Sequence, residues 1–132
     1  NPSSVRPWQF VLEPISGYLA LGLILFSKSK KYKLPSWNFG PDIDKIYTVD
    51  HLLKYTKNKI FNDLKYNYKK NNRIYESKLL FLSNEKAKLE LGWMPKFDVE
   101  QTLKLTFDWY NSYFKGDKMF NISLDQINKY SK

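Results

Sequence analysis

An uncharged stretch, residues 14–27, restricts the possible folds of this chain more than any other feature. It is shorter than the roughly 20 apolar residues that a membrane-spanning helix needs, so we expect it to belong to a soluble domain with no membrane partner. The sequence predicts a helix that begins near Glu13, buries one apolar stripe and lets another element approach closely at Gly22. The stripe residues recur at spacings of three and four, the period of one helix face: Leu12, Ile15, Leu19, Leu23 and Phe26.

The rest of the pattern predicts more helices and a few short strands within one domain, residues 1–132. Local signals mark the helix ends: Ser83, Asp98 and Ser123 are expected N-caps, Asp98 opens a capping box, and Gly92 and Gly116 are expected to end helices. We therefore predict a small, mostly helical α+β domain with few strands, which suggests a unit that packs against something else. The expected helices cover 49–61, 83–91, 98–116 and 123 onward, and the expected strands cover 37–39, 64–68 and 79–82.

The chain contains no Cys and one His, which excludes several kinds of site. Disulfides, thiolate catalysis and Cys-ligated metals are ruled out, and so is a metal site built from several histidines of this chain. We expect no metal. The chain begins with Asn1-Pro2 and carries nothing like a targeting leader, so we interpret it as the tail of a longer cytoplasmic protein.

The net charge of +9 would suit a polyanionic partner, but its composition weakens that interpretation. The basic residues are 20 Lys and 2 Arg, whereas nucleic-acid surfaces favour Arg. We expect solvated surface lysines and no nucleic-acid partner. The alternative is a small single-strand nucleic-acid binder, which would need aromatic side chains exposed beside lysines, although most aromatic residues here fall on expected core stripes.

The two arginines, Arg6 and Arg73, stand out in a chain that otherwise uses Lys. A guanidinium presents a fixed fork of donors that matches phosphate oxygens, so two such groups could bind a diphosphate. The alternative is that one pairs with a carboxylate such as Glu13 or Glu76 while the other lies on the surface. No Gly-rich phosphate loop and no acid–base constellation stands out, so the residues alone do not describe an enzyme.

Several short motifs, in order along nearly the whole chain, carry a resemblance to a known family. They include Asn1-Pro2, Arg6-Pro7-Trp8-Gln9, Val11-Leu12-Glu13-Pro14, Gly17-Tyr18-Leu19, Trp37-Asn38-Phe39-Gly40-Pro41, Lys86-Ala87, Leu91-Gly92-Trp93, Pro95, Trp109-Tyr110 and Gln126-Ile127. Together they resemble the C-terminal part of CDP-glucose 4,6-dehydratases, which are extended short-chain dehydrogenase/reductase enzymes.

The resemblance implies a two-domain parent whose N-terminal Rossmann domain, absent from this chain, binds NAD. The smaller C-terminal domain would hold the nucleotide-sugar substrate, CDP-glucose. The implied lyase reaction oxidises the sugar at C4, eliminates water across C5 and C6, and gives the 4-keto-6-deoxy sugar used in deoxysugar and O-antigen biosynthesis. The parent is expected to be a homo-oligomer and this chain alone to be inactive. The alternative is a related epimerase or a dehydratase of another nucleotide sugar.

The same resemblance assigns substrate contacts but no catalytic residue to this chain. Arg6 falls where extended members commonly place an arginine on the diphosphate, and Arg73 aligns with a second one in epimerase-like relatives. Glu76 matches an acidic position of the dehydratases, and Gln9 belongs to the marker that contains Arg6. Tyr75 stands near the expected nucleotide site, where the dehydratases usually carry His.

Overall fold

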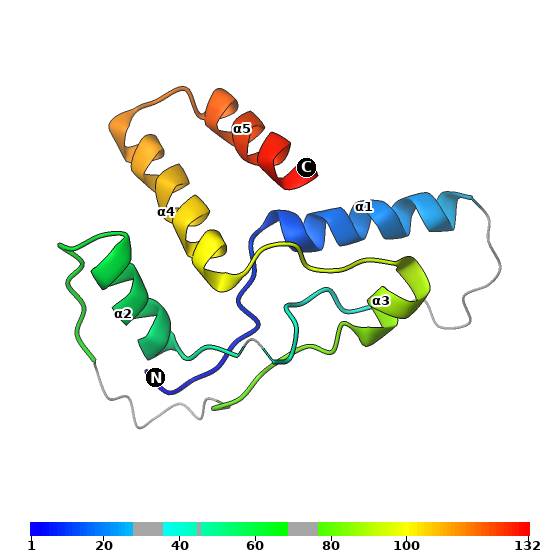
Figure 1. The fold of residues 1–132 in the computed structure, drawn as a ribbon, viewed down its shortest axis with the longest axis horizontal. Helices are drawn as coiled ribbons and strands as arrows, with labels where there is room; N and C mark the ends of the chain where they lie inside the picture. Colours follow the sequence, from blue (N-terminus) through cyan, green and yellow to red (C-terminus); the bar gives the residue numbers. More distant parts are fainter. Residues whose placement is uncertain (28–35, 45, 69–76) are drawn as a thin grey trace.

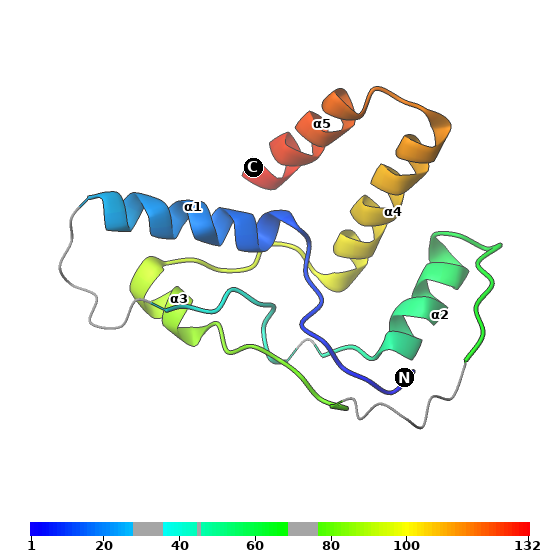
Figure 2. The ribbon, with the colours of Figure 1, turned by 180° about the vertical axis from the view of Figure 1, so that it is seen from behind.

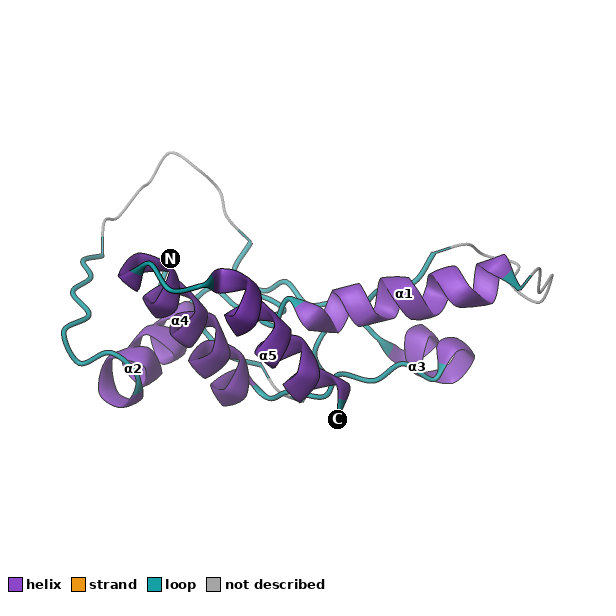
Figure 3. Cartoon of the chain, turned by 90° about the horizontal axis from the view of Figure 1, so that it is seen from above, coloured by secondary structure: helices purple, strands orange, loops and turns teal. Residues whose placement is uncertain are grey.

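The computed structural model describes residues 1–27, 36–44, 46–68 and 77–132. In Figure 1, α1 lies beside α3 at one end of the molecule, while α4 lies beside α5 at the other with α2 nearby. The views from behind and from above show the same two groups (Figures 2 and 3). The predicted mostly helical character is therefore confirmed. The helices of the described ranges are α1 (Leu12–Phe26), α2 (Val49–Lys59), α3 (Glu85–Leu91), α4 (Val99–Lys115) and α5 (Met119–Ser131).

The expected strands do not form within the described ranges, so the β part of the predicted α+β class is not confirmed. Extended pairing there is limited to isolated bridges of Val5, antiparallel to Thr48 and parallel to Leu79. Alternation of polar and apolar residues at 64–68 indicates an extended backbone, but a strand also needs a partner ladder. Instead, the rings of Tyr66 and Tyr68 pack edge to face on each other, 5.7 Å apart.

Two helix ends confirm the local signals in detail. The Asp98 carboxylate accepts a hydrogen bond from Gln101 N at 2.8 Å, and the Gln101 side chain accepts one from Asp98 N at 3.1 Å, which completes the capping box. Gly92 and Gly116 follow α3 and α4 with φ of 64° and 78°. This left-handed conformation is costly for residues with a Cβ, so glycine ends both helices.

Two predicted N-caps are wrong because tertiary contacts set the helix starts. α3 begins two residues after Ser83, and its N-cap residue Asn84 donates its side-chain amide to the Gly40 carbonyl at 2.9 Å. α5 begins four residues before Ser123. The Ser123 hydroxyl accepts a hydrogen bond from Trp109 Nε1 at 3.0 Å, which ties α5 to α4. The Ser123 side chain thus bonds to a distant residue and does not cap a helix.

The core at the α1–α3 end is built around the ring of Phe39. Trp93 packs edge to face on that ring, with centroids 5.1 Å apart, and Ala87 of α3 is 0% exposed. Gly17 brings α1 so close that an added Cβ would lie 2.3 Å from Phe39 Cδ1. α1 therefore packs on the core through a glycine. Partly buried apolar residues that complete the cluster are Leu21, Trp37 and Leu91.

The prediction that α1 buries its apolar stripe is wrong for this chain. Most of the stripe is exposed to solvent, and the buried residues of α1 are Glu13 and Gly17, which lie on the opposite side. Two aromatic residues of α4, Tyr110 and Phe114, are also exposed. The periodicity indicated a helix face that prefers burial, but no described element covers it.

Candidate functional site

Arg6 follows the point where three separate segments meet. Val5 N donates to the Lys78 carbonyl at 2.8 Å, and Leu80 N donates back to the Val5 carbonyl at 3.2 Å. On the other side, Val49 N donates to the Ser4 carbonyl at 3.0 Å, which joins the same segment to the start of α2. The backbone before Arg6 is therefore fixed by two neighbours that are distant in sequence.

The Arg6 side chain is partly buried and held by its own backbone. Its Nη1 donates to the Val5 carbonyl at 2.6 Å, and Trp8 N donates to the Arg6 carbonyl at 2.8 Å in a tight turn. Trp8 Nε1 in turn donates to the Tyr47 carbonyl at 3.1 Å. The first bond orients the guanidinium, and the Trp8 bonds tie the segment that carries it to Tyr47, shortly before α2. A pre-oriented fork suits an anionic ligand.

Gln9, the other described residue of the predicted site, contacts the loop that carries Phe39. Its Nε2 donates to the Phe39 carbonyl at 3.0 Å. Its Oε1 is buried and has no hydrogen-bond partner among the described residues. Gln9 thus connects the segment after Arg6 to the core. Three predicted site residues, Arg73, Tyr75 and Glu76, lie outside the described residues, so the convergence of two arginines remains a prediction.

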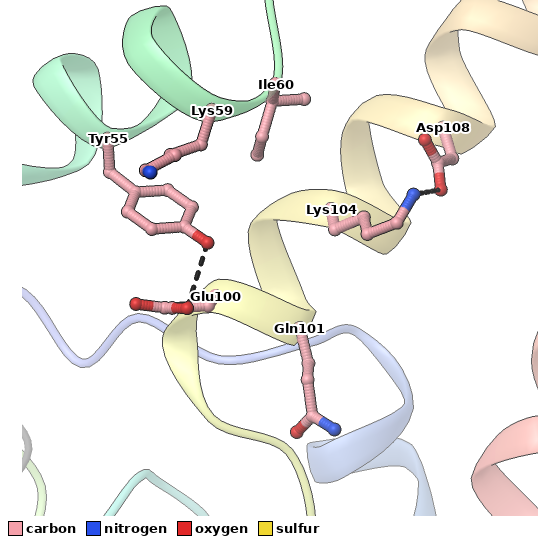
Figure 4. A pocket seen from close by; sticks show the side chains of 7 residues that line it. All are labelled: Tyr55, Lys59, Ile60, Glu100, Gln101, Lys104 and Asp108. Atoms are coloured by element: carbon pink, nitrogen blue, oxygen red, sulfur yellow. Dashed lines mark hydrogen bonds and ion pairs between the residues drawn. The ribbon is translucent and has the colours of Figure 1, made fainter.

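A hollow of about 340 Å³ lies between α2 and α4 (Figure 4). Tyr55 projects from α2 toward Glu100 of α4, and Lys59 of α2 lies beside the Tyr55 ring. The Tyr55 hydroxyl donates to Glu100 Oε2 at 2.9 Å, and this hydrogen bond raises the pKa of Tyr55. Lys104 forms an ion pair with Asp108 at 2.7 Å. Two lysines against two carboxylates leave no net positive field, so this hollow does not suit a diphosphate.

A second hollow, of about 360 Å³, lies where the start of α1 meets α4 and α5. Its walls are mostly apolar, and two of its polar side chains are engaged within the fold: Gln126 Nε2 donates to the Leu105 carbonyl at 2.8 Å, and Ser123 accepts from Trp109. Neither Arg6 nor Gln9 lines either hollow. Sequence reasoning found neither hollow because each depends on how separate helices pack. The second hollow is nevertheless lined by residues of three motifs that carry the resemblance: Val11-Leu12, Trp109-Tyr110 and Gln126-Ile127.

A buried carboxylate ties the first turn of α1 to the end of α5. Glu13 is 1% exposed and accepts hydrogen bonds from Lys96 N at 3.0 Å, Phe97 N at 2.8 Å and the Tyr130 hydroxyl at 2.8 Å. Burial is the main cause that raises the pKa of Tyr130 to about 12. Ser16 extends the network through its hydroxyl, 2.8 Å from that of Tyr130.

This network bears on one alternative that the sequence left open, the pairing of an arginine with Glu13. Glu13 was a possible partner for an arginine, but its carboxylate is bonded to backbone amides and a tyrosine. Charge-assisted bonds of this kind satisfy a buried carboxylate without a cation. The signal that could have revealed this role is a lone acidic residue that opens a long uncharged helix.

Comparison with known proteins supplies what the geometry alone does not. The chain is 32% identical over 130 residues, 98% of its length, to the CDP-glucose 4,6-dehydratase of Salmonella typhimurium strain LT2. The resemblance to CDP-glucose 4,6-dehydratases is confirmed. The match spans 36% of the Salmonella protein, so this chain covers about one third of that relative's length. No protein-family model matches the chain.

Several motifs that carry the resemblance prove to be packing residues. Phe39, Ala87 and Trp93 form the buried core described above, and Gly92 ends α3 in the left-handed conformation. These motif residues therefore maintain the fold of this chain. Within the described ranges, no cluster of three metal-binding side chains occurs, and none of the helices there combines the length and apolarity that a membrane crossing requires.

Proposed function

We propose that this chain is the C-terminal, substrate-binding part of a nucleotide-sugar 4,6-dehydratase that acts on CDP-glucose. The observation that carries the proposal is the 32% identity to a CDP-glucose 4,6-dehydratase over 98% of the chain. The reaction as a whole would belong to a longer protein or assembly, because the match spans only 36% of that relative. On this proposal the chain alone is inactive.

Arg6 is the residue of this chain that we assign to the substrate diphosphate. A guanidinium has five N–H donors in a fixed plane, and the bond to the Val5 carbonyl sets the direction of that plane. The segment that follows Glu76 supports the proposed site, because residues 78–80 pair with Val5 directly before Arg6. Arg73, Tyr75 and Glu76 are proposed to complete the substrate contacts.

NAD does not fit the residues of this chain. A dinucleotide site needs a Gly-rich turn between a parallel strand and a helix, and no such strand occurs within the described ranges. The five glycines, at 17, 22, 40, 92 and 116, are too far apart for that motif. The cofactor would therefore be bound by the rest of the dehydratase, and we assign this chain the binding and orientation of the sugar nucleotide only.

The proposal is tested by transplanting the chain into an active relative. In a fusion, this chain replaces the matching segment of the Salmonella dehydratase, and turnover of CDP-glucose and the KM are measured. Arg6→Lys keeps the charge but loses the fork, so we expect the KM for CDP-glucose to rise by about 10-fold or more, with NAD binding unchanged. Lys104→Gln, which removes a cation between α2 and α4, is the matched control.

Equal KM values for the fusion and its Arg6→Lys variant would refute the diphosphate contact. Should the fusion not fold, the isotope-labelled 132-residue chain is titrated with CDP-glucose and followed by NMR. We expect the Arg6 guanidinium and Trp8 indole signals to shift, and UDP-glucose to shift them less. No shift at either group would count against the proposal, and equal shifts with both sugars would indicate a related nucleotide-sugar enzyme.

A further inference from the structure

The exposed face of α1 is apolar along its whole length. Four residues of the stripe predicted from the sequence are open to solvent: Ile15 is 41% exposed, Leu19 66%, Leu23 73% and Phe26 88%. Figures 1 and 2 show the second half of α1 extending away from α4 and α5, with α3 alongside it. Glu13 bonds to residues 96–97 and Tyr130, and Gly17 packs on the Phe39 ring, so the exposed face is the opposite one.

A surface helix normally carries charged or polar residues on its outer face. Here residues 14–27 contain no charge, and Val11 and Tyr18, which are also exposed, widen the apolar stripe instead of bordering it with polar groups. A continuous patch of this kind marks a surface that another protein element covers. The apolar stripe has the spacing of a buried helix face, and a partner outside the described residues would bury it.

Gly22 gives this face a shape as well as a composition. It lies four residues from Tyr18 and Phe26, on the same side of the helix, and an added Cβ there would have no heavy atom within 4 Å. Gly17, in contrast, lies on the buried side, where the Phe39 ring takes the space that a Cβ would need. α1 therefore carries one glycine on its buried side and one on its exposed side. The space beside Gly17 is taken by Phe39, whereas the space beside Gly22 is open and would let another backbone approach closely.

We propose that this face of α1 packs permanently against the remainder of the dehydratase, the part for which this chain has no counterpart. The inference rests on the proposed function and on the length of the Salmonella relative, of which the match spans 36%. A second copy of this chain is a poorer occupant, since two chains of net charge +9 repel each other. A contact surface without charges is typical of obligate interfaces, which resemble a protein core cut in two.

The test compares a double substitution on this face with one elsewhere. Leu19→Glu with Leu23→Glu places two charges in the proposed interface, and Leu89→Glu on α3, where Leu89 is 83% exposed, is the control. In the fusion with the Salmonella dehydratase, we expect the α1 variant to lower Tm by about 5 °C or more and the control by less than about 2 °C. In the 132-residue chain alone, both variants should keep the parent Tm, because both sites are exposed.

Two results would overturn the inference. One is a fusion whose α1 variant melts like its control. The other is a 132-residue chain that sediments as a dimer and becomes monomeric on the α1 substitutions, which would make a second copy the occupant. Measuring turnover of CDP-glucose as well distinguishes this inference from the proposed function. A fusion that is inactive, but whose Tm falls on the α1 substitutions, would refute the proposed function and leave the packing of α1 supported. If the fusion does not fold, the substitutions are made at the aligned positions of the intact Salmonella dehydratase.

Discussion

Two glycines in one helix allow the packing of α1 to be measured against an internal control. Replacing Gly by Ala in a helix stabilises it by about 1 kcal/mol when the new methyl group meets nothing. At Gly22 that condition holds, because no heavy atom lies within 4 Å of the added Cβ. Gly22→Ala should therefore raise the free energy of unfolding of the 132-residue chain by up to about 1 kcal/mol.

Gly17→Ala gains the same helix propensity but inserts its methyl group into the core. The added Cβ would lie 2.3 to 2.6 Å from three carbon atoms of the Phe39 ring. That ring cannot move freely, because Trp93 and Tyr18 pack on it with centroids at 5.1 and 5.5 Å. Overpacking of this kind costs about 1–3 kcal/mol, so Gly17→Ala should be less stable than Gly22→Ala by that amount.

The difference between the two variants is read from urea unfolding followed by far-UV circular dichroism and by tryptophan fluorescence. Both alanine variants gain the same helix propensity, so this gain cancels when they are compared. If their m values are equal, the difference between their urea midpoints reports only the clash of the added methyl group with Phe39. Equal stabilities within about 0.5 kcal/mol would show that α1 does not pack on Phe39 as described, and would also undermine the assignment of the opposite face as the exposed one.

Two further predictions concern the buried network of α1. Glu13→Gln replaces one acceptor oxygen by a donor facing N–H groups, so the free energy of unfolding should fall by about 2–3 kcal/mol in urea; a loss below about 0.5 kcal/mol would contradict the network. Tyr130, with a pKa of about 12 in the fold against 10.0 ordinarily, contributes stability that is complete below pH 10 and lost as pH rises toward 12. Tyr130→Phe should therefore lower stability at neutral pH and flatten its decline between these values; an unchanged decline would count against this assignment.

Signals that act within one helix turn were sufficient to predict several boundaries. The Asp98 capping box and the glycines at 92 and 116 involve backbone groups within a few residues, and each is found where the sequence places it. Ser83 and Ser123 carried equally good local signals and failed as caps. The contact between Ser123 and Trp109 shows why, since it depends on how two helices pack.

The apolar stripe of α1 shows a different kind of limit. Its spacing correctly predicted the helix but not its packing, because periodicity does not say which element covers an apolar face. The side of α1 that packs within this chain uses Gly17 and the polar Glu13, which no hydrophobic pattern would select. For the candidate site, the residues alone offered only the rarity of Arg6 and Arg73 among lysines, and the proposed assignment of Arg6 to a diphosphate depends on the resemblance.

The contact between Glu13 and Tyr130 joins residues 117 positions apart in sequence. During synthesis on the ribosome, the N-terminal helix therefore emerges long before one of the groups that its acidic side chain requires. An unpartnered carboxylate is costly to bury, so the first helix should not settle into place until the final turns have left the exit tunnel. Docking of α1 is then completed only after α5 has emerged, and removal of Tyr130 would take away one of the hydrogen bonds that satisfy Glu13.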